Sequence, residues 1–543
     1  MYSLGIDFGS ESGRVLIVDE NGATISTSVV PYRHGVITEH LPSSEENTLP
    51  QDFALQHPED YLEVLQTGIP KALYKANITN RSISGVGIAF TSSTVLATDK
   101  NLTPMCLYKQ HKADPHAWVK LWKHHSAQKE SMEILNKAKN RQEEWLGSFG
   151  NQISAEWLLP KCLETFYKSP KLYSNTEFFI EAGDWIVSIL TGKVVRSNCS
   201  LGFKALWNEK SGFPTDFFKA LNSDFGNTMP LKLRGEIKNV GEKAGNITKE
   251  MADKTGLLKG TPVAVSIIDA HSSLLGIGAS NQNQLTMVMG TSTCHLMSHK
   301  QFKYVSGISG VVKDAVIPGL FTYEAGQSAV GDLFGWYQGQ VPFEYIKEAN
   351  DSEISIFQLL ENKAQKLTPG ESGLISLDWH NGNRSILSNF DLSGAMIGIT
   401  LNTTPEEIYL SLLEASAFST KVIFDTYENA GLIVEDVFAC GGLPLKNELL
   451  MQTYADVLNK NIKVSQTTQA SGVGASILGA IAGGIYNDIN KASQAMKQPF
   501  IKTYTPIKDN VIKYNSLFNI YQQIHDYFGR ERPNIMKTLK ISK

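Results

Sequence analysis

Short apolar blocks separated by polar turns open the chain. Residues 2–8 form an apolar run that predicts a buried strand, and residues 14–19 and 23–30 predict two more strands. The pair Asn21-Gly22 lies between the last two runs. Because an Asn-Gly pair at this position favours a tight turn, the sequence predicts a β-hairpin here.

A helix and a further strand follow this hairpin. The polar residues 42–57 predict a loop, and Pro58 then suits the first turn of a helix that continues to about Ala76. Residues 84–90 are again apolar and predict a strand. Strands that alternate with helices indicate an α/β fold.

The same kinds of element are predicted in the second half of the chain. Residues 261–268 and 437–440 predict strands, and residues 404–431 predict a long helix. Residues 472–486 are rich in Gly, Ala and Ser and too few to cross a bilayer comfortably, so they predict a tightly packed helix. Apolar residues recur at helical spacing over residues 511–528, which predicts a last helix packed on a lobe.

One short internal echo links the two halves. Residues 4–10 and residues 287–293 each run from an apolar strand into a glycine and a hydroxyl residue. The chain has 543 residues, whereas single cores stop growing at about 250–300 residues. We therefore expect two lobes, each with one strand–turn loop suited to a phosphate.

Composition and charge narrow the classes of partner. The formal net charge of -4 gives no reason to expect a nucleic acid or an anionic membrane. The five cysteines are scattered and form no Cys-x-x-Cys pair, so neither a disulfide framework nor a zinc site is indicated. Scattered cysteines of this kind fit a reducing cytosol. The first residues show no basic leader followed by an apolar core, so we expect no signal peptide and a cytoplasmic protein.

The first candidate phosphate loop is residues 7–14. A Walker A loop is not found, since Gly192-Lys193 is followed by Val194. In residues 7–14 a glycine lets backbone N–H groups approach a phosphate, and hydroxyl and guanidinium groups can donate to it. Asp7 is placed to hold Mg²⁺, which usually keeps several waters. A plain hairpin with an acidic turn is the alternative. The residues predicted to contact the nucleotide here are Gly9, Ser10, Glu11 and Arg14.

Two later turns could complete a nucleotide site. The first has small and hydroxyl residues directly after a strand, and the second has a glycine pair followed by a helix that continues to about Asn459. Either turn alone is ordinary, but three suitable turns in this order are unlikely by chance. The predicted contacts are Gly290, Thr291, Ser292 and Thr293 in the first, and Gly441, Gly442 and Asn447, the last for the nucleoside, in the second.

These three segments resemble the two phosphate motifs and the adenosine motif of the actin-like ATPase superfamily. The resemblance implies an α/β, two-lobed actin-like (ribonuclease H-like) fold, with ATP in a cleft between the lobes. The lobes are expected at residues 1–276 and 277–490, with a helical extension at residues 491–543 that packs on a lobe.

Asp269 distinguishes among the members of this superfamily. It follows a predicted strand, and a carboxylate at such a strand end can accept the proton of an alcohol during phosphoryl transfer. Alternatively it only caps the next helix. Its position between the two phosphate loops resembles that of the catalytic Asp of FGGY carbohydrate kinases, which implies ATP and Mg²⁺, the latter held by Asp7 and Asp269. His271 and His295 are interpreted as structural.

Narrower resemblances are to the ribulokinase branch of that family. They lie in residues 119–125, 202–207, 321–328 and 377–385, and at the strand end 90–94. Taken singly, the tryptophan of the first segment could be a core residue, the lysine of the second a surface charge, and the glutamate of the third a structural ion-pair partner. The implied sugar contacts are Ser92, Ser93, Trp122, Lys204, Asp269 and Glu324.

The resemblance implies ATP-dependent phosphorylation of L-ribulose to L-ribulose 5-phosphate in arabinose breakdown, by an enzyme that could form a homodimer. A kinase for xylulose, ribitol or glycerol is the nearest alternative, and an actin-like or chaperone-like ATPase and a nonenzymatic sugar sensor are others. Residues 154–166 depart from the general family pattern, and residues 394–414 match it only approximately. These departures concern the choice of sugar rather than the kinase reaction.

Overall fold

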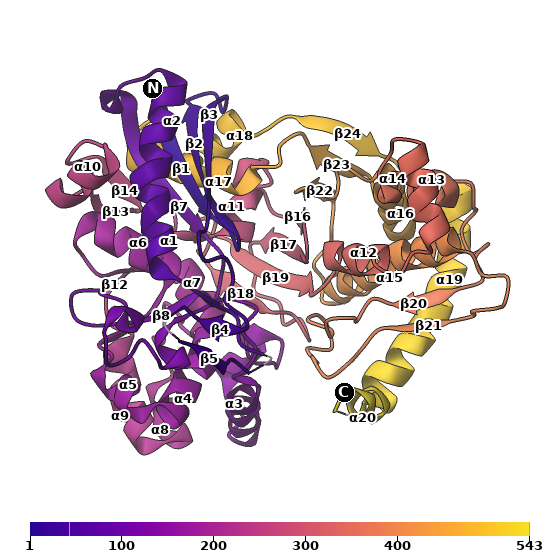
Figure 1. Cartoon of the computed structure of the whole chain (residues 1–543), viewed down its shortest axis with the longest axis horizontal. Helices are drawn as coiled ribbons and strands as arrows, with labels where there is room; N and C mark the ends of the chain where they lie inside the picture. The colour runs from indigo at the N-terminus through magenta and orange to yellow at the C-terminus, as the bar shows by residue number, and fades with distance from the viewer. Residues whose placement is uncertain (43, 51, 542–543) are drawn as a thin grey trace.

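The computed structural model describes residues 1–42, 44–50 and 52–541. The chain forms two lobes, and each is built on a seven-stranded mixed sheet with helices around it (Figure 1). The predicted two-lobed α/β architecture is therefore confirmed. Among the described residues, no helix combines the length and the apolar character that crossing a bilayer requires.

The N-terminal sheet has the order β13-β14-β7-β1-β2-β3, with β15 also paired to β7. β1, β2 and β3 form an antiparallel meander, whereas β7 and β14 run parallel to β1. Gly22 has a φ of 88°, so the predicted Asn-Gly hairpin is confirmed. The strands are β1 (Tyr2–Phe8), β2 (Ser12–Asp19), β3 (Thr24–Pro31), β7 (Ile83–Phe90), β13 (Lys243–Asn246), β14 (Pro262–Ala264) and β15 (Ile267–Ile268).

The predicted helix after Pro58 is also confirmed. It consists of α1 (Pro58–Glu63), a π-helical turn (Val64–Gly68) and α2 (Ile69–Ala76). The predicted loop at residues 42–57, of which 43 and 51 lie outside the described residues, is partly wrong because it contains β5 (Ser44–Thr48) and β6 (Leu55–Gln56). These strands form by pairing with β4 (His40–Leu41) and β9 (Val119–Lys120), and a polar pattern does not reveal such pairing.

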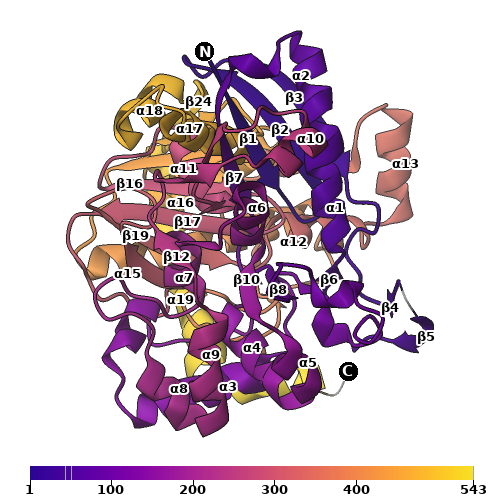
Figure 2. The same ribbon diagram turned by 90° about the vertical axis from the view of Figure 1, so that its left-hand side faces the viewer.

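A second part of the N-terminal lobe has its own apolar core. A four-stranded sheet, β10-β8-β9-β6, lies beside a group of helices at the bottom of Figure 2. Its remaining elements are β8 (Val95–Thr98), β10 (Phe178–Glu181), α3 (Gln128–Asn140), α4 (Leu158–Lys168), α5 (Pro170–Asn175), α8 (Thr215–Leu221) and α9 (Ser223–Lys232). The other elements of the N-terminal lobe are α6 (Ala182–Thr191), β11 (Val195–Ser197), α7 (Asn198–Lys204), β12 (Glu236–Lys238), α10 (Lys249–Thr255) and α11 (Asp269–Gly276).

The C-terminal sheet repeats the arrangement of the first sheet. β16, β17 and β19 form an antiparallel meander, and β22 and β23 continue it in parallel. The short echo in the sequence thus corresponds to a repeated topology. The strands are β16 (Gln284–Met289), β17 (Thr293–His299), β18 (Gly310–Lys313), β19 (Phe321–Gln327), β22 (Asp436–Cys440), β23 (Ile462–Ser465) and β24 (Phe500–Tyr504), and β20 (Ile375–Leu377) and β21 (Ala395–Ile397) form a separate pair.

Helices cover this second sheet. The predicted helix at 404–431 is confirmed as α15, which begins with a capping box between Thr404 and Glu407. The predicted helix after the glycine pair is confirmed as α16, with Asn459 as its C-cap. The helices are α12 (Gly331–Gln338), α13 (Phe343–Asp351), α14 (Ile356–Ala364), α15 (Pro405–Asn429), α16 (Glu448–Leu458), α19 (Lys508–Asp526) and α20 (Pro533–Ile541), whereas α18 (Ile489–Met496) packs against α17 (Ala470–Ala482) and α11.

Helix α17 (Ala470–Ala482) packs on the sheet of the other lobe, where it contacts β1, β7 and α11 (Figure 1). A Cβ placed on Gly87 would lie 1.8 Å from the carbonyl oxygen of Ala475. The backbones therefore approach more closely than side chains would allow, as the Gly, Ala and Ser content predicted.

The last part of the chain, residues 491–543, is not entirely helical. It contains β24, which pairs with β23 at the edge of the C-terminal sheet, before α19 packs against α16. The lobe boundaries at residues 276 and 490 remain predictions.

Candidate active site

Three strands of the N-terminal sheet end at the same level. Phe8 of β1 and Ile268 of β15 both pair with Phe90 of β7. The residues that follow these strands, including Gly9 and Asp269, therefore share one carboxyl edge. Ligands of open α/β sheets bind at such edges.

The first phosphate loop is a tight turn between β1 and β2. The N–H of Gly9 donates to the carbonyl of Ser12 at 3.0 Å. The Asp7 carboxylate accepts from the Arg14 guanidinium at 3.1 Å and from the Ser471 hydroxyl at 2.8 Å. Ser471 is the second residue of α17 (Ala470–Ala482), so this hydrogen bond joins the turn to the start of that helix.

The second and third turns lie at the carboxyl edge of the C-terminal sheet. The N–H of Gly290 donates to the carbonyl of Ser292 at 2.9 Å, directly after β16. Gly441 follows the neighbouring β22 with a φ of 106°, and a Cβ there would lie 2.2 Å from the carbonyl oxygen of Met289. Only glycine fits that position without strain.

Asp269 is the first residue of α11, and its carboxylate accepts its neighbour's backbone N–H, that of Ala270, at 2.7 Å. Burial and the nearby charge of Asp7 raise the pKa of Asp269 to about 7. A carboxyl group with such a pKa is suited to accept a proton near neutral pH. The structure makes Ile268 the N-cap of α11 and Asp269 its first residue, so the role of Asp269 stays a prediction.

Lys204 and Glu324 form an ion pair between the lobes. The Lys204 ammonium lies 2.7 Å and 3.0 Å from the two carboxylate oxygens, and both side chains are largely buried. Nε2 of His271 lies 3.2 Å from the same carboxylate. Burial alone would raise the pKa of Glu324, but Lys204 and His271 hold it well below its ordinary value.

Trp122 contacts the turn between β1 and β2. Its indole N–H donates to the Ser10 hydroxyl at 3.0 Å. The guanidinium of Arg384, from the C-terminal lobe, lies 5.6 Å from the centre of its ring system. Trp122 is therefore fixed from both sides at the lobe interface.

Most of the predicted site residues line one cleft of about 260 Å³ between the lobes. Those that line it are Asp7, Gly9, Ser10, Arg14, Ser92, Trp122, Lys204, Asp269, Gly290, Thr291, Ser292, Glu324 and Gly441.

Five predicted residues do not line this cleft: Glu11, Ser93, Thr293, Gly442 and Asn447. The Asn447 side chain caps α16 by accepting the Leu450 N–H at 2.8 Å, and it also donates to the Tyr409 hydroxyl at 2.7 Å. The roles of all five residues in binding stay predictions.

The sequence-based prediction did not include several residues that line the cleft. Glu156 lies in the segment that departs from the family pattern, and Arg384 lies in segment 377–385, one of those with the narrower resemblance. They are 228 positions apart, and the Arg384 guanidinium donates to the Glu156 carboxylate at 2.9 Å. Only the closeness of these segments in the fold could have linked them. Thr91, Ala270, Ser273, Val288, Cys294, Cys440, Thr468, Ala470 and Ser471 complete the lining.

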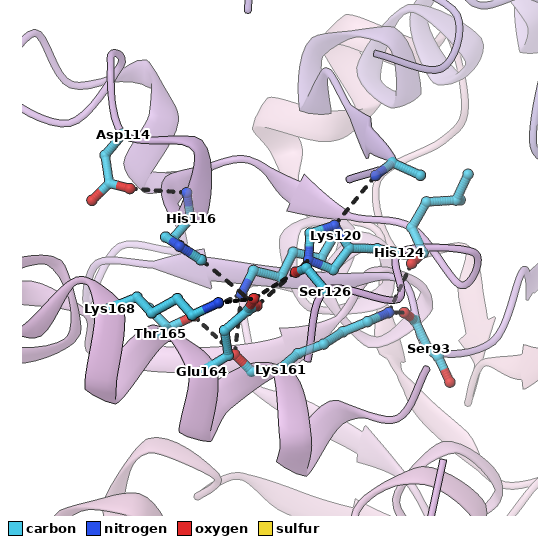
Figure 3. A network of polar contacts seen from close by, with 12 residues as sticks. Ser93, Asp114, His116, Lys120, His124, Ser126, Lys161, Glu164, Thr165 and Lys168 are labelled. Carbon is cyan, nitrogen blue, oxygen red and sulfur yellow. Dashed lines mark hydrogen bonds and ion pairs between the residues drawn. The ribbon is translucent and has the colours of Figure 1, made fainter. Parts of the chain in front are cut away.

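A buried polar network holds the loops that carry Ser92 and Trp122 (Figure 3). The Lys161 ammonium, from α4, donates to the carbonyls of Ser93 and Leu121, each at 2.7 Å. One helix thus holds the loop that carries Ser92 and the loop that carries Trp122. One turn further along α4, Glu164 binds the Lys120 ammonium at 2.7 Å, and His116, His124, Ser126 and Lys168 surround that carboxylate.

Both lobes match models of one enzyme family. Residues 2–276 match the N-terminal domain, and residues 285–483 the C-terminal domain, of the FGGY family of carbohydrate kinases. The chain belongs to this family. It is 49% identical over 539 residues to "Ribulokinase 2" of Staphylococcus saprophyticus, which covers 99% of both chains. It is 47% identical over 540 residues to a ribulokinase of Staphylococcus aureus, which covers 99% of this chain and 98% of the relative.

Solved structures show the same fold at low sequence identity. A ligand-bound xylulose kinase from Lactobacillus acidophilus superposes with a TM-score of 0.81 at 18% identity, covering 98% of this chain and 99% of that one. A glycerol kinase from Plasmodium falciparum with ADP gives a TM-score of 0.76 at 17% identity, covering 96% and 97% of the two chains. These likenesses establish the two-lobed fold and leave the sugar open.

Proposed function

We propose that this chain transfers the γ-phosphoryl group of ATP to L-ribulose, which yields ADP and L-ribulose 5-phosphate. The observation that carries the proposal is one cleft that Asp269 lines together with the glycine turns at Gly9 and Gly290 and the polar side chains of Lys204 and Glu324. The full-length likeness to two proteins named ribulokinase supports the choice of sugar.

In this reaction Asp269 accepts the proton of the primary alcohol as the alcohol oxygen attacks the γ-phosphorus. The backbone N–H groups of the turns at Gly9 and Gly290, together with Arg14, bind phosphate oxygens. Closure of the lobes excludes water, which would otherwise compete with the sugar for the phosphoryl group.

Mg²⁺ fits the donor set at the phosphate end of the cleft. Asp7 and Asp269 both line it, and the Asp7 charge contributes to the raised pKa of Asp269. Two carboxylates that repel each other are suited to a divalent cation with oxygen ligands. Bound there, Mg²⁺ would neutralise charge on the phosphate oxygens.

The polar pocket suits an uncharged ketopentose. Lys204 can donate to hydroxyl or keto oxygens, Glu324 can accept from hydroxyls, and the face of Trp122 can cover carbon atoms. The paired charges of Lys204 and Glu324 balance each other, so the pocket does not require a charged sugar.

A panel of sugars tests this proposal. The purified chain with ATP and Mg²⁺ should show the highest kcat/KM for L-ribulose among L-ribulose, D-xylulose, ribitol and glycerol, measured by coupled ADP release. A clear preference for another member would show the proposed sugar to be wrong, and ATP hydrolysis unaffected by any sugar would favour a different class of ATPase.

Asp269→Asn tests the role of the base. Loss of proton transfer should lower kcat by about 10²- to 10⁴-fold, while L-ribulose still binds in calorimetry. Asp253→Asn, at an exposed position of α10, is the control. Unchanged turnover of Asp269→Asn would remove Asp269 from the reaction.

The setting of the enzyme belongs to the same proposal. We infer a cytoplasmic enzyme of L-arabinose breakdown, in keeping with five cysteines that are all free. A homodimer is expected and can be checked by light scattering of the purified chain.

A further inference from the structure

Two ion pairs cross between the lobes at the sugar end of the cleft, with opposite polarity. In the first, the N-terminal lobe supplies the cation, Lys204, and the C-terminal lobe supplies the anion, Glu324. In the second, the N-terminal lobe supplies the anion, Glu156, and the C-terminal lobe supplies the cation, Arg384. The site described so far assigns a role only to the first pair.

Arg384 is held in place by its surroundings. Its Nη2 donates to Glu156 at 2.9 Å, and its guanidinium lies 5.6 Å from the centre of the Trp122 ring system. A Cβ on Gly326 would lie 3.6 Å from its Cδ, so its stem lies against β19, the strand that carries Glu324. The partner is also fixed, because His125 lies 3.2 Å from Glu156.

One N–H donor of Arg384 is enclosed by protein atoms. Among the described residues, no acceptor is found for its buried Nε–H. Both Arg384 and Glu156 line the main cleft, and both also line a smaller recess beside Lys204 and Glu324 that Asp269 does not line. The Arg384 side chain, which is 13% exposed, therefore borders the part of the cleft beside Lys204 and Glu324 and away from Asp269.

The charge state of the pair supports this geometry. Burial alone would raise the pKa of Glu156, but Arg384 and His125 lower it to about 2. Glu156 is thus ionised near neutral pH and keeps the guanidinium in one orientation. A planar guanidinium fixed in this way can bind a carboxylate on one side and a sugar oxygen on another.

We propose that Arg384 is a further substrate-binding residue, whose guanidinium donates to an oxygen of the sugar remote from the transferred phosphoryl group, and that Glu156 is its positioning residue. This inference rests on the proposed sugar kinase activity. It assigns both cross-lobe pairs to sugar recognition, so that the complete sugar site exists only when the lobes are together.

Steady-state kinetics of three variants test the inference. In Arg384→Met, loss of a hydrogen bond from a charged donor should raise the KM for the sugar by about 10- to 100-fold, with a smaller change in kcat and little change in the KM for ATP. Arg384→Lys should recover part of the affinity, since it keeps the charge without the planar fork. Glu156→Gln should raise the KM for the sugar less than Arg384→Met does.

The double variant separates positioning from an independent effect. If Glu156 acts only through Arg384, adding Glu156→Gln to Arg384→Met should raise the KM no further. Arg234→Met is the matched control, because Arg234 also pairs with a glutamate, Glu177, and lies 4.5 Å from an aromatic ring, that of Phe178, but does not line the cleft. Its KM for the sugar should equal that of the wild type.

The assay keeps the two proposals apart. The wild-type chain is first measured on the sugar panel, and the variants are then measured on whichever sugar it phosphorylates best, so a wrong sugar does not decide the role of Arg384. An unchanged sugar KM in Arg384→Met overturns the inference. So does an equal rise of both KM values with a lowered melting temperature in both Arg384→Met and Arg384→Lys, because that pattern indicates a brace between the lobes. A wild type that phosphorylates none of the sugars contradicts both proposals.

Discussion

Lys161 is a buried ammonium whose two main acceptors are carbonyl groups on different loops, at Ser93 and Leu121. Burial lowers its pKa to about 7. A lysine amine carries at least two N–H donors whether protonated or neutral, so this contact does not depend on the charge state.

Replacing Lys161 should therefore disturb the sugar site without touching the sugar. Lys161→Met leaves the buried carbonyl of Ser93 without a donor and takes one of two donors from the Leu121 carbonyl, which still accepts the His124 N–H at 3.0 Å. We expect the KM for the sugar to rise by about tenfold, with a smaller effect on the KM for ATP. Initial-rate measurements at varied sugar and ATP would check this.

The matched control for Lys161→Met is Lys168→Met on the same helix, at a half-exposed position that pairs with Glu164. Its sugar KM should stay near that of the wild type. Equal effects of the two substitutions would indicate a general weakening of α4 rather than a specific hold on the loops.

Some site residues could be predicted from the sequence because the backbone at their position accepts only that type of residue. Gly441 is one, because its backbone conformation and its approach to Met289 exclude a side chain. Glu156 and Arg384 have no such local signal, since they lie 228 positions apart and meet only in the folded chain. The Asn447 side chain, in turn, has partners within its own lobe that the motif did not indicate.

At the scale of elements, the contact between α17 and the N-terminal sheet is the most sensitive to added volume. In Gly87→Ala the new Cβ would lie 1.8 Å from a backbone carbonyl oxygen of α17, so the helix or the strand must move. We expect a loss of at least about 2 kcal/mol of stability, measured as a lower unfolding midpoint. Activity should also fall, because Ser471 at the start of α17 donates to Asp7.

Gly335→Ala is the control for added volume in a helix. A Cβ on Gly335 meets no atom within 4 Å, and the residue lies inside α12. Alanine there should be neutral or should stabilise the protein by up to about 1 kcal/mol. If both glycine substitutions had the same effect, the close packing of α17 would not be the cause.

The elements themselves were largely predictable, whereas their partners were not. The small-residue composition of α17 indicated a tight contact, yet nothing in residues 472–486 specified the sheet of the first lobe. The strands at residues 44–48 and 55–56 were missed because they exist through pairing with β4 and β9 rather than through an apolar pattern.

At the scale of the whole molecule, buried acids should make stability depend on pH. Burial raises the pKa of Glu414 to about 8, whereas an exposed glutamate titrates near 4.3. Between these values the folded chain binds a proton that the unfolded chain releases, so the stability from this group is lost as pH rises. Burial also raises the pKa of Glu181 to about 8, with the same consequence.

Glu414→Gln removes one such group and keeps a similar shape. The stability of the variant relative to wild type should increase by about 1.4 kcal/mol per pH unit between pH 5 and 8, seen as a growing difference in melting temperature. Glu209→Gln, at an exposed position, should show no such trend. A difference that stays constant across this range would mean that Glu414 is already ionised in the folded chain.

The two-lobed plan could be predicted from the repeated strand–turn segments, because each encodes the start of one sheet. The way the chain returns from one lobe to the other could not, since that depends on contacts between residues 1–90 and 470–482.

Because α17 comes late in the chain but packs on the N-terminal sheet, the order of translation affects folding of the N-terminal lobe. The first 276 residues contain the strands of the N-terminal sheet, but the helix that covers β1 and β7 leaves the ribosome only after residue 482 has been made. Until then a strip of small and apolar residues on that sheet stays bare. The first lobe to be translated is thus completed only near the end of translation, and a fragment that stops at residue 276 should aggregate unless the rest of the chain is supplied.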